Sequence, residues 1–406
     1  MLIANLTKVL VERNPSAGPG AERAVGEAVQ SIAQGATEGD SRLQQALDLL
    51  KANKISEAAQ LLNAFAEDKM VRIEKDRKEA AIAYRNLGAI AGLADPKRAL
   101  EAYEKALALD PDDVQSLLGA GWIQIDYGDL NKAQERLERV QKLAQSDYQT
   151  SYKYAAAGGL GEVKYRRGDL TGALQSYRDT IPIIDRLAKS DPGNAGWQRD
   201  LSVSHNRIGG VQQAQGDLAG ALKSYEADLA ISDRLARSDP GNAGWQRDLS
   251  VSYEKIGDVQ KAQGDLAGAL KSYSDSLAIR DRLARSDPGN AGWQRDLSVS
   301  YEKIGDVQQA QGDLACALKS YEADLAISDR LARSDPGNAG WQRDLAVTSG
   351  KLALVHRQLG DSAKARDYLR RSREIMARLT KLSPDNAQWK QGLAKFDREI
   401  AELAKR

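Results

Sequence analysis

The chain has 406 residues, of which 42% are hydrophobic and 28% charged, a balance typical of a folded protein rather than a disordered one. Its formal net charge of +1 excludes the overall basicity of nucleic-acid-binding proteins, and no run of 18 apolar residues predicts a membrane span. The lone cysteine, Cys316, excludes an intramolecular disulfide, and the first residues lack the basic lead of a signal peptide, so we expect a soluble cytoplasmic protein.

Residues 1–40 are predicted to form an N-terminal segment that precedes a set of repeats. Two flexible breaks are expected, at 14–20 and 36–40, because glycine and small or polar residues are concentrated there. Between these breaks, residues 21–33 predict a short helix. We therefore expect a partly flexible segment that contains one short helix.

From residue 190 onward, one segment of 48 residues recurs almost unchanged. Residues 190–237 match residues 286–333 at 43 of 48 positions, and residues 238–285 match the same segment at 42. Five tryptophans mark the recurrence at this spacing: Trp197, Trp245, Trp293, Trp341 and Trp389. A fixed period of this length is typical of a solenoid, in which each unit packs only on its neighbours.

Residues 242–289 show how one unit is predicted to fold. Asn242 follows a Pro-Gly turn and is suited to cap a first helix, in which apolar residues recur at helical spacing from Trp245 onward. Gly264 can end this helix at positive φ, and Asp265 can cap a second helix. Each unit is therefore predicted to be a hairpin of two helices. We expect the tryptophan, in the first turn of the first helix, to cover the joint between successive hairpins.

These hairpins resemble the tetratricopeptide repeat, a family that places a Leu-Gly pair, a turn glycine, a small alanine and an aromatic residue at set offsets. The resemblance is carried here by Ile256-Gly257, Gly264, Ala269 and Tyr273, and in the second repeat by Leu87-Gly88, Ala99, Tyr103, Ala106 and Pro111. The 48-residue unit departs from the family at Ser276, which replaces a second alanine, and in its longer second helix. The resemblance implies an all-α fold, an α–α solenoid wound as a right-handed superhelix of helical hairpins.

By this resemblance, residues 41–385 hold about eight repeats and residues 386–406 form a C-terminal capping helix. A cap is expected because the last hairpin would otherwise expose an apolar face. The predicted hairpins span roughly 41–73, 74–111, 112–146, 147–193, 194–241, 242–289, 290–337 and 338–385.

In this family, ligand-contacting residues lie on the first helices, which line a concave groove. Carried over by position, the resemblance gives these groove residues: Asn206, Gly210, Gln213, Glu254, Asp258, Lys261, Glu302, Asp306, Gln309, Lys351 and Arg357. The fifth and seventh repeats differ mainly on this surface, which suits either a graded groove or neutral drift on a solvent face. Because several of these residues are acidic, a C-terminal carboxylate ligand is disfavoured, and a basic or mixed-charge protein or peptide is the expected partner.

The sequence shows no catalytic or metal-binding constellation. His205 and His356 lie about three repeats apart, so they cannot share a metal or a proton relay. Cys316 has no histidine beside it in sequence or one repeat away, which leaves a catalytic Cys–His pair unsupported. The glycine-rich stretch 158–161 does not follow a predicted strand, which disfavours a phosphate-binding loop. We therefore predict no enzymatic activity, no cofactor and no metal.

The leading hypothesis is a non-enzymatic scaffold that binds a protein or peptide in the concave groove, with no nucleic-acid or membrane partner. The alternative is a regulatory or sensor array of a larger bacterial signalling protein, because arrays of this family often follow a Toll/interleukin-receptor-like or caspase-like domain. Self-association is a third hypothesis, since residues 290–337 carry five Lys/Arg against eight Asp/Glu, whereas residues 346–406 carry fourteen against seven.

Overall fold

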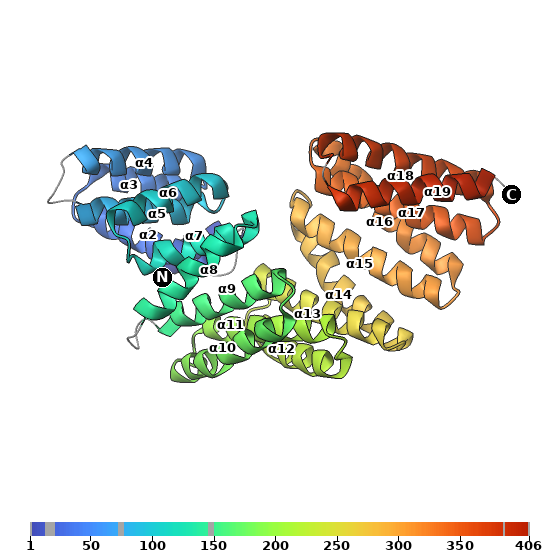
Figure 1. Ribbon diagram of the computed structural model, residues 1–406, viewed down its shortest axis with the longest axis horizontal. Coiled ribbons are helices and arrows are strands. Elements are labelled where there is room, and N and C mark those ends of the chain that lie inside the picture. Colours follow the sequence, from blue (N-terminus) through green and yellow to red (C-terminus); the bar gives the residue numbers. More distant parts are fainter. Residues whose placement is uncertain (1, 13–20, 72–76, 145–149, 385, 405–406) are drawn as a thin grey trace. The chain divides into compact units, whose positions relative to one another are not determined.

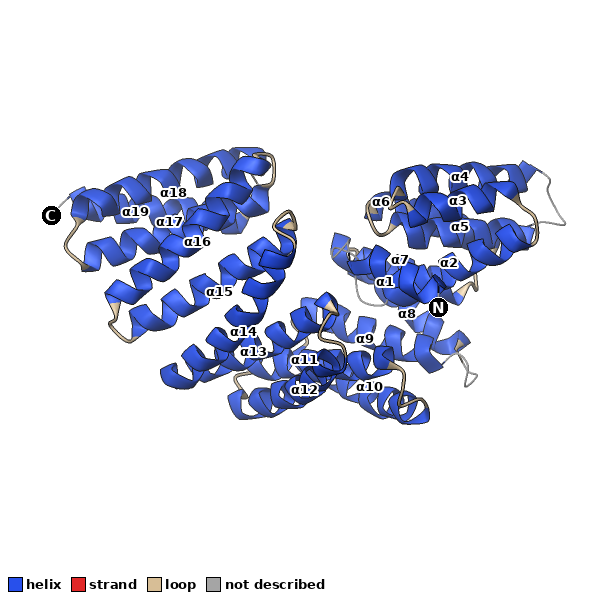
Figure 2. Ribbon diagram, turned by 180° about the vertical axis from the view of Figure 1, so that it is seen from behind, coloured by secondary structure: helices blue, strands red, loops and turns tan. Residues whose placement is uncertain are grey.

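The computed structural model describes residues 2–12, 21–71, 77–144, 150–384 and 386–404. These residues form helices joined by turns and short loops, without any β-strand (Figure 2), which confirms the predicted all-α fold. The chain divides into two compact units, Met1–Asp217 and Leu218–Arg406. Within each unit, consecutive helices pack against one another, as expected for an α–α solenoid.

The first unit contains the first eleven helices (Figure 1). Their bounds are Leu2–Glu12 (α1), Ala21–Thr37 (α2), Ser41–Lys51 (α3), Ile55–Val71 (α4), Arg77–Ala91 (α5), Pro96–Leu109 (α6), Val114–Tyr127 (α7), Leu130–Leu143 (α8), Thr150–Arg166 (α9), Leu170–Ser190 (α10) and Ala195–Ala214 (α11). The helix predicted at 21–33 corresponds to α2, which continues to Thr37 and is followed by the turn before α3. The break predicted at 14–20 lies outside the described residues.

The second unit contains the remaining helices, and each one packs on the next (Figure 1). Their bounds are Leu218–Ser238 (α12), Ala243–Ala262 (α13), Leu266–Ser286 (α14), Ala291–Ala310 (α15), Leu314–Ser334 (α16), Ala339–Gln358 (α17), Ser362–Leu382 (α18) and Ala387–Ala404 (α19). The final helix, α19, packs against α18 after the last hairpin.

Side-chain caps and glycine turns fix where these helices begin and end. The Asn242 side chain accepts a hydrogen bond from the Trp245 N–H at 3.2 Å, and the equivalent bonds at the starts of α15 and α17 measure 3.0 and 3.1 Å. Gly264 ends α13 with a φ of 84°, a conformation that strains other residues. Asp265 then accepts the Gly268 N–H at 2.9 Å and caps α14. The helix ends therefore lie where the sequence signals predicted them.

Within a hairpin, the two helices approach closely at the glycine of the Leu-Gly position. A Cβ atom added to Gly257 would lie 2.7 Å from the Tyr273 ring, and one added to Gly305 would lie 2.7 Å from the Tyr321 ring. Both tyrosines are almost completely buried. The glycine thus makes room for the aromatic ring, which is the physical reason why the two residues occur together in the motif.

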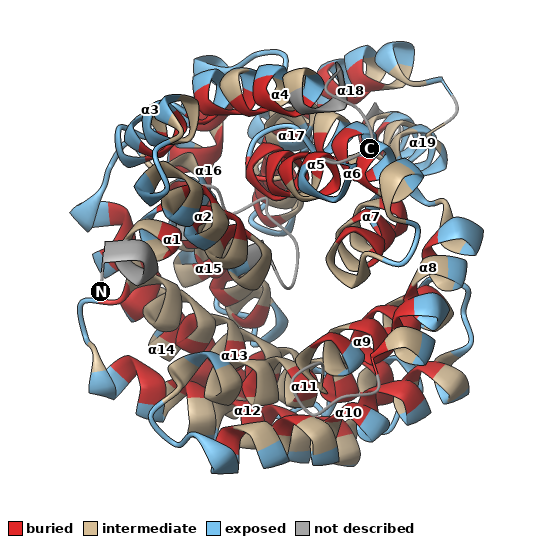
Figure 3. Ribbon diagram, turned by 90° about the vertical axis from the view of Figure 1, so that its left-hand side faces the viewer, coloured by how far each residue is buried: buried red, intermediate tan, exposed pale blue. Residues whose placement is uncertain are grey.

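The tryptophans lie at the joints between hairpins, as the sequence predicted. Trp245 and Trp293 pack against a buried cluster around Leu249 and Leu283, so residues of consecutive hairpins meet there. One repeat later, Trp293 and Trp341 pack on the equivalent cluster. Each of these indoles is half-buried. Trp293 packs on both clusters, so this one side chain contributes to two successive joints. Figure 3 shows buried positions recurring along the helices of each unit.

Replacing Gly257 with alanine should destabilise the second unit, because the added methyl group would overlap the Tyr273 ring. Overpacking of this kind costs about 1–3 kcal/mol, which would lower the midpoint of thermal unfolding followed by circular dichroism. Gly289→Ala is the matched control, since a Cβ atom added there would approach its nearest neighbour, Asp287 Oδ1, only to 3.4 Å. An equal midpoint for the two variants would contradict this account of the packing.

Candidate partner-binding face

The predicted groove residues all lie on first helices of the hairpins, and each is half-buried. In the second unit they are Glu254, Asp258 and Lys261 on α13, Glu302, Asp306 and Gln309 on α15, and Lys351 and Arg357 on α17. In the first unit they are Asn206, Gly210 and Gln213, which lie on α11. We call the surface formed by α13, α15 and α17 the second-unit face.

Ion pairs connect neighbouring first helices across the second-unit face. Lys303 on α15 reaches back to Asp258 on α13, with Nζ 2.6 Å from Oδ1. Lys261 on α13 reaches forward to Asp306 on α15, with Nζ 3.0 Å from Oδ2. One repeat later, Lys351 on α17 contacts Asp306 in the same way as Lys303 contacts Asp258. The structure therefore brings several predicted residues together, but largely in contact with one another.

These contacts keep both partners charged. Burial disfavours the charged form of Lys351, but the carboxylates of Glu302, at 2.7 Å, and of Asp306 raise its pKa above the usual value. Burial also acts to raise the pKa of Asp306, but Lys351 holds that pKa below its usual value. Asp306 also accepts a hydrogen bond from the Tyr321 hydroxyl at 2.8 Å. The acidic residues are therefore neutralised within the protein rather than presented as net negative charge.

Sequence reasoning missed two cationic members of this network. Lys303 lies 45 residues after its partner Asp258, and the same separation recurs between Lys351 and its aspartate partner. That separation is three short of the 48-residue period. The aspartate and lysine positions therefore lie about one helical turn apart within a repeat, and each lysine pairs with the aspartate of the preceding repeat. The second missed residue, Arg280 on α14, is almost fully buried and lies 2.6 Å from Glu254.

Lys255 occupies the same position in its repeat as Lys303 and Lys351 but has no side-chain partner within the described part of the chain. The residue 45 positions before Lys255 is Gly210, so the carboxylate used by the other two lysines is absent from the sequence. The Lys255 side chain is half-buried on α13. Of these three lysines, it is the one whose ammonium group is available to an acidic group of a ligand.

A separate set of polar groups is buried where hairpins meet. Asp324 on α16 is only 2% exposed and accepts hydrogen bonds from Ser298 on α15 and from Thr348 on α17, the latter at 2.7 Å. Burial raises the pKa of Asp324 to about 7, with Glu302 adding to the shift, while the two hydroxyl groups and Lys351 oppose it. The folded protein therefore holds a proton on this carboxyl group at a pH where an ordinary aspartate is ionised.

The described residues contain no group of His, Cys, Asp and Glu side chains arranged to hold a metal. His356 is buried and stacks on Tyr368, with ring centroids 5.6 Å apart. The glycine-rich stretch 158–161 lies inside helix α9 rather than in a loop. Of the helices that the structure describes, none has both the length and the hydropathy needed to cross a membrane.

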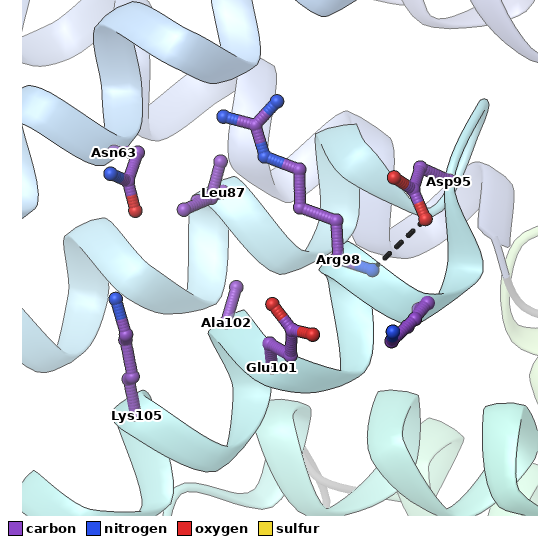
Figure 4. Close-up of a pocket in the computed structure, with 8 residues that line it drawn as sticks. Asn63, Leu87, Asp95, Arg98, Glu101, Ala102 and Lys105 are labelled. Atoms are coloured by element: carbon purple, nitrogen blue, oxygen red, sulfur yellow. Dashed lines mark hydrogen bonds between the residues drawn. The ribbon is translucent and has the colours of Figure 1, made fainter.

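The first unit carries a polar cleft of about 460 Å³ that is formed by α4, α5 and α6 (Figure 4). Its lining residues are Asn63, Leu87, Asp95, Lys97, Arg98, Glu101, Ala102 and Lys105. Asp95 is used by the fold itself, because its carboxylate accepts the Arg98 N–H at 3.0 Å and caps α6. The α6 wall carries three basic side chains and the acidic Glu101, so the cleft presents both signs of charge.

The buried carboxyl group of Asp324 predicts an unusual dependence of stability on pH. Because its pKa is raised on folding, the contribution of Asp324 to the free energy of unfolding should fall as pH rises from about 4 to about 7. Asp324→Asn should therefore stabilise the protein at pH 8, by about 1–4 kcal/mol, and change little near pH 4. Urea unfolding at both pH values checks this. Asp275→Asn is the control, since Asp275 pairs with the exposed Lys271, and an equal gain for Asp324→Asn at both pH values would contradict the assignment.

Two family models, both described as tetratricopeptide repeat, match the chain over residues 43–113 and 92–157. No curated protein matches it. Among solved structures, BtubC (BKLC) from P. vanneervenii is 19% identical with a TM-score of 0.49, covering 64% of this chain and 92% of that one. PilF from Pseudomonas aeruginosa is 16% identical with a TM-score of 0.40, covering 70% and 98%.

The chain is also similar to PH0952 from Pyrococcus horikoshii, a signal transduction ATPase with numerous domains and a tetratricopeptide repeat sensor. That structure is 13% identical with a TM-score of 0.49, and the match covers 85% of this chain and 52% of that one. Likeness at this level of identity concerns the fold alone. The matching repeats at 43–157, together with helical hairpins that carry the same glycine and tyrosine contact further along, show that the chain is a tetratricopeptide-repeat protein.

Proposed function

We propose that this protein is a non-enzymatic scaffold that binds a segment of another protein along the second-unit face. Tetratricopeptide repeats are typically non-catalytic modules that bind protein partners. The observation that carries the proposal is the row of half-buried polar side chains on α13, α15 and α17, which are linked from one helix to the next by ion pairs. Such a row offers one extended surface to a ligand that spans several repeats.

The ion pairs indicate the charge of the ligand. A strongly basic peptide gains little from Asp258 and Asp306, because Lys303 and Lys351 already neutralise them. Lys255, in contrast, has no carboxylate partner among the described residues and can accept one from a ligand. We therefore infer a partner segment of mixed charge, with an acidic residue placed at Lys255.

The proposal extends to the remaining predicted positions and to the organisation of the chain. Asn206, Gly210 and Gln213 on α11 are the corresponding positions of the first unit. We propose that residues 41–385 form about eight repeats and that α19 caps the array. We also propose a cytoplasmic location, because a single cysteine suits a reducing compartment.

A photo-crosslinking amino acid placed at Lys255 should capture a protein partner in source cells, because this position lies on the second-unit face. The same amino acid at Lys271 is the matched control, since Lys271 lies on α14 with its side chain 80% exposed and pairs with Asp275 of its own helix. Mass spectrometry of the crosslinked species measures the outcome. Equal capture at both positions, or no capture at Lys255, would argue against this face as the binding site.

Once a partner segment is identified, Lys255→Glu should weaken its binding by at least about tenfold, because a charge-assisted contact is replaced by repulsion. Lys271→Glu should leave the dissociation constant unchanged. Isothermal titration with the purified segment measures both values. Unchanged affinity for Lys255→Glu would show that the ligand does not place an acidic group at this lysine.

A further inference from the structure

Helix α2 lies on the side of the first unit where the first helices are aligned. We call the surface formed by α5, α7, α9 and α11 the first-unit face. Helix α7 packs on both α5 and α9, and the Tyr154 hydroxyl of α9 donates to the Asp200 carbonyl of α11 at 2.8 Å. Helix α2 packs against α5 and α7, and Figures 1 and 2 both draw it beside these two helices. A helix from outside the repeats therefore covers part of this face.

The side of α2 that is turned to the protein carries an aliphatic stripe. Val25, Ala28, Val29 and Ile32 recur at helical spacing, and each is at most 1% exposed. They belong to the buried cluster that also contains residues of α3, α4 and α5. Three polar residues of α2 remain exposed to solvent on its other side: Glu22, Gln30 and Gln34. Helix α2 is thus an amphipathic helix with a buried aliphatic side and an exposed polar side, and α1 and α3 pack against it as well.

Beside the aliphatic stripe, α2 carries three polar residues at intervals of four: Arg23, Glu27 and Ser31. Residues four apart lie above one another on the same side of a helix. These three side chains therefore form one polar stripe, about two helical turns long, next to the aliphatic one.

Each residue of the polar stripe meets a different first helix. Ser31 accepts a hydrogen bond from the Asn86 amide of α5 at 3.0 Å, and Glu27 accepts one from the Tyr152 hydroxyl of α9 at 2.8 Å. The Arg23 guanidinium lies 4.5 Å from the centroid of the Trp197 ring of α11. The order of these contacts shows that α2 runs along the face from α5 toward α11.

Two of the groups that α2 satisfies are buried polar side chains of the repeats themselves. Asn86 is 6% exposed and Tyr152 is 7% exposed, and the Tyr152 hydroxyl also accepts a hydrogen bond from Gln115 of α7 at 2.7 Å. Buried donors require partners, and these donors direct their hydrogens to α2. Successive repeats therefore recognise α2 through a defined polar group each, which is how a solenoid recognises a helical ligand.

We propose that the first-unit face is a receptor for an amphipathic helix and that α2 is its resident occupant, which an external helix replaces. The external helix has an arginine, an acidic residue and a small hydroxyl residue at intervals of four, next to a stripe of small aliphatic residues. An external helix must compete with a tethered one, whose effective concentration is of millimolar order. The inference concerns the first unit and does not depend on the proposed function of the second-unit face.

A fluorescent peptide with the sequence of residues 21–37, added to the full chain, tests this proposal by anisotropy. The full chain with Val29→Asp should bind the peptide at least about tenfold more tightly than the unaltered chain, because a buried aspartate disfavours the docked position of α2. Val9→Asp is the matched control, since Val9 is 40% exposed on α1. A peptide that itself carries Val29→Asp should not bind.

The proposal is overturned if the Val29→Asp chain keeps its helix content by circular dichroism yet binds no peptide, or if all chains bind equally. If that variant unfolds, hydrogen exchange of the unaltered chain decides. A displaceable α2 exchanges its amides faster than α5, because its release is a local event. Exchange of α2 at the same rate as α5 shows that it is an integral part of the fold and overturns the proposal.

Discussion

A lysine on one first helix reaches back to an aspartate on the preceding first helix, and the same contact recurs one repeat later. In a solenoid, each repeat contacts only its neighbours, so a half-buried charged side chain must find its partner in its own repeat or in an adjacent one. The arrangement of Lys303 with Asp258 meets this requirement. It also ties the second-unit face together, because the side chains that a ligand would contact already hold one another in place.

The contact between Gly257 and Tyr273 places the first helix of a hairpin against the second, whereas the charge pairs connect one hairpin to the next. The Tyr321 hydroxyl belongs to both systems, since its ring packs on Gly305 and its oxygen donates to Asp306. Hairpin packing thereby orients the carboxylate that the next lysine uses. The motif residues of the repeat and the polar residues of the face are therefore not independent sets.

Most of the fold could be predicted from the sequence, because the helix caps, the turn glycines and the tryptophans recur every 48 residues. Asn242, Gly264 and the tryptophans indicated helix ends and joints through the known behaviour of caps, turns and large apolar side chains. The acidic residues and two of their lysine partners, Lys261 and Lys351, were predicted on the correct helices. Lys303 and the pairing itself were not predicted, because pairing depends on the offset between adjacent repeats. Residues 1–40 contain no repeat, so the spacing of Val25 and Ile32 could predict an amphipathic helix but not the surface that it covers.

Asp324 and Arg280 lie outside what sequence reasoning could place, because charged residues on a second helix are ordinarily exposed. Both are buried, and each is satisfied by hydroxyl groups of neighbouring first helices. The serines at positions 250, 298 and 300 recur with the repeat, so the same small polar niche accepts either a guanidinium or a carboxyl group. A neutral hydroxyl lining explains why near-identical units tolerate this exchange.

The fixed spacing of the charge pairs has a consequence for how such an array changes over time. The pairs that join neighbouring first helices on the second-unit face connect positions 45 or 49 residues apart, close to one period of the repeat. Loss of the whole segment 238–285 would place the repeat of Lys303 directly after that of Gly210, and Lys303 would then take the role of Lys255. Gain or loss of an entire unit thus alters the length of the array. The first lysine of the series still follows the repeat of Gly210 and still has no carboxylate partner there. Such an array can lengthen or shorten by recombination between its own near-identical segments without losing its internal complementarity.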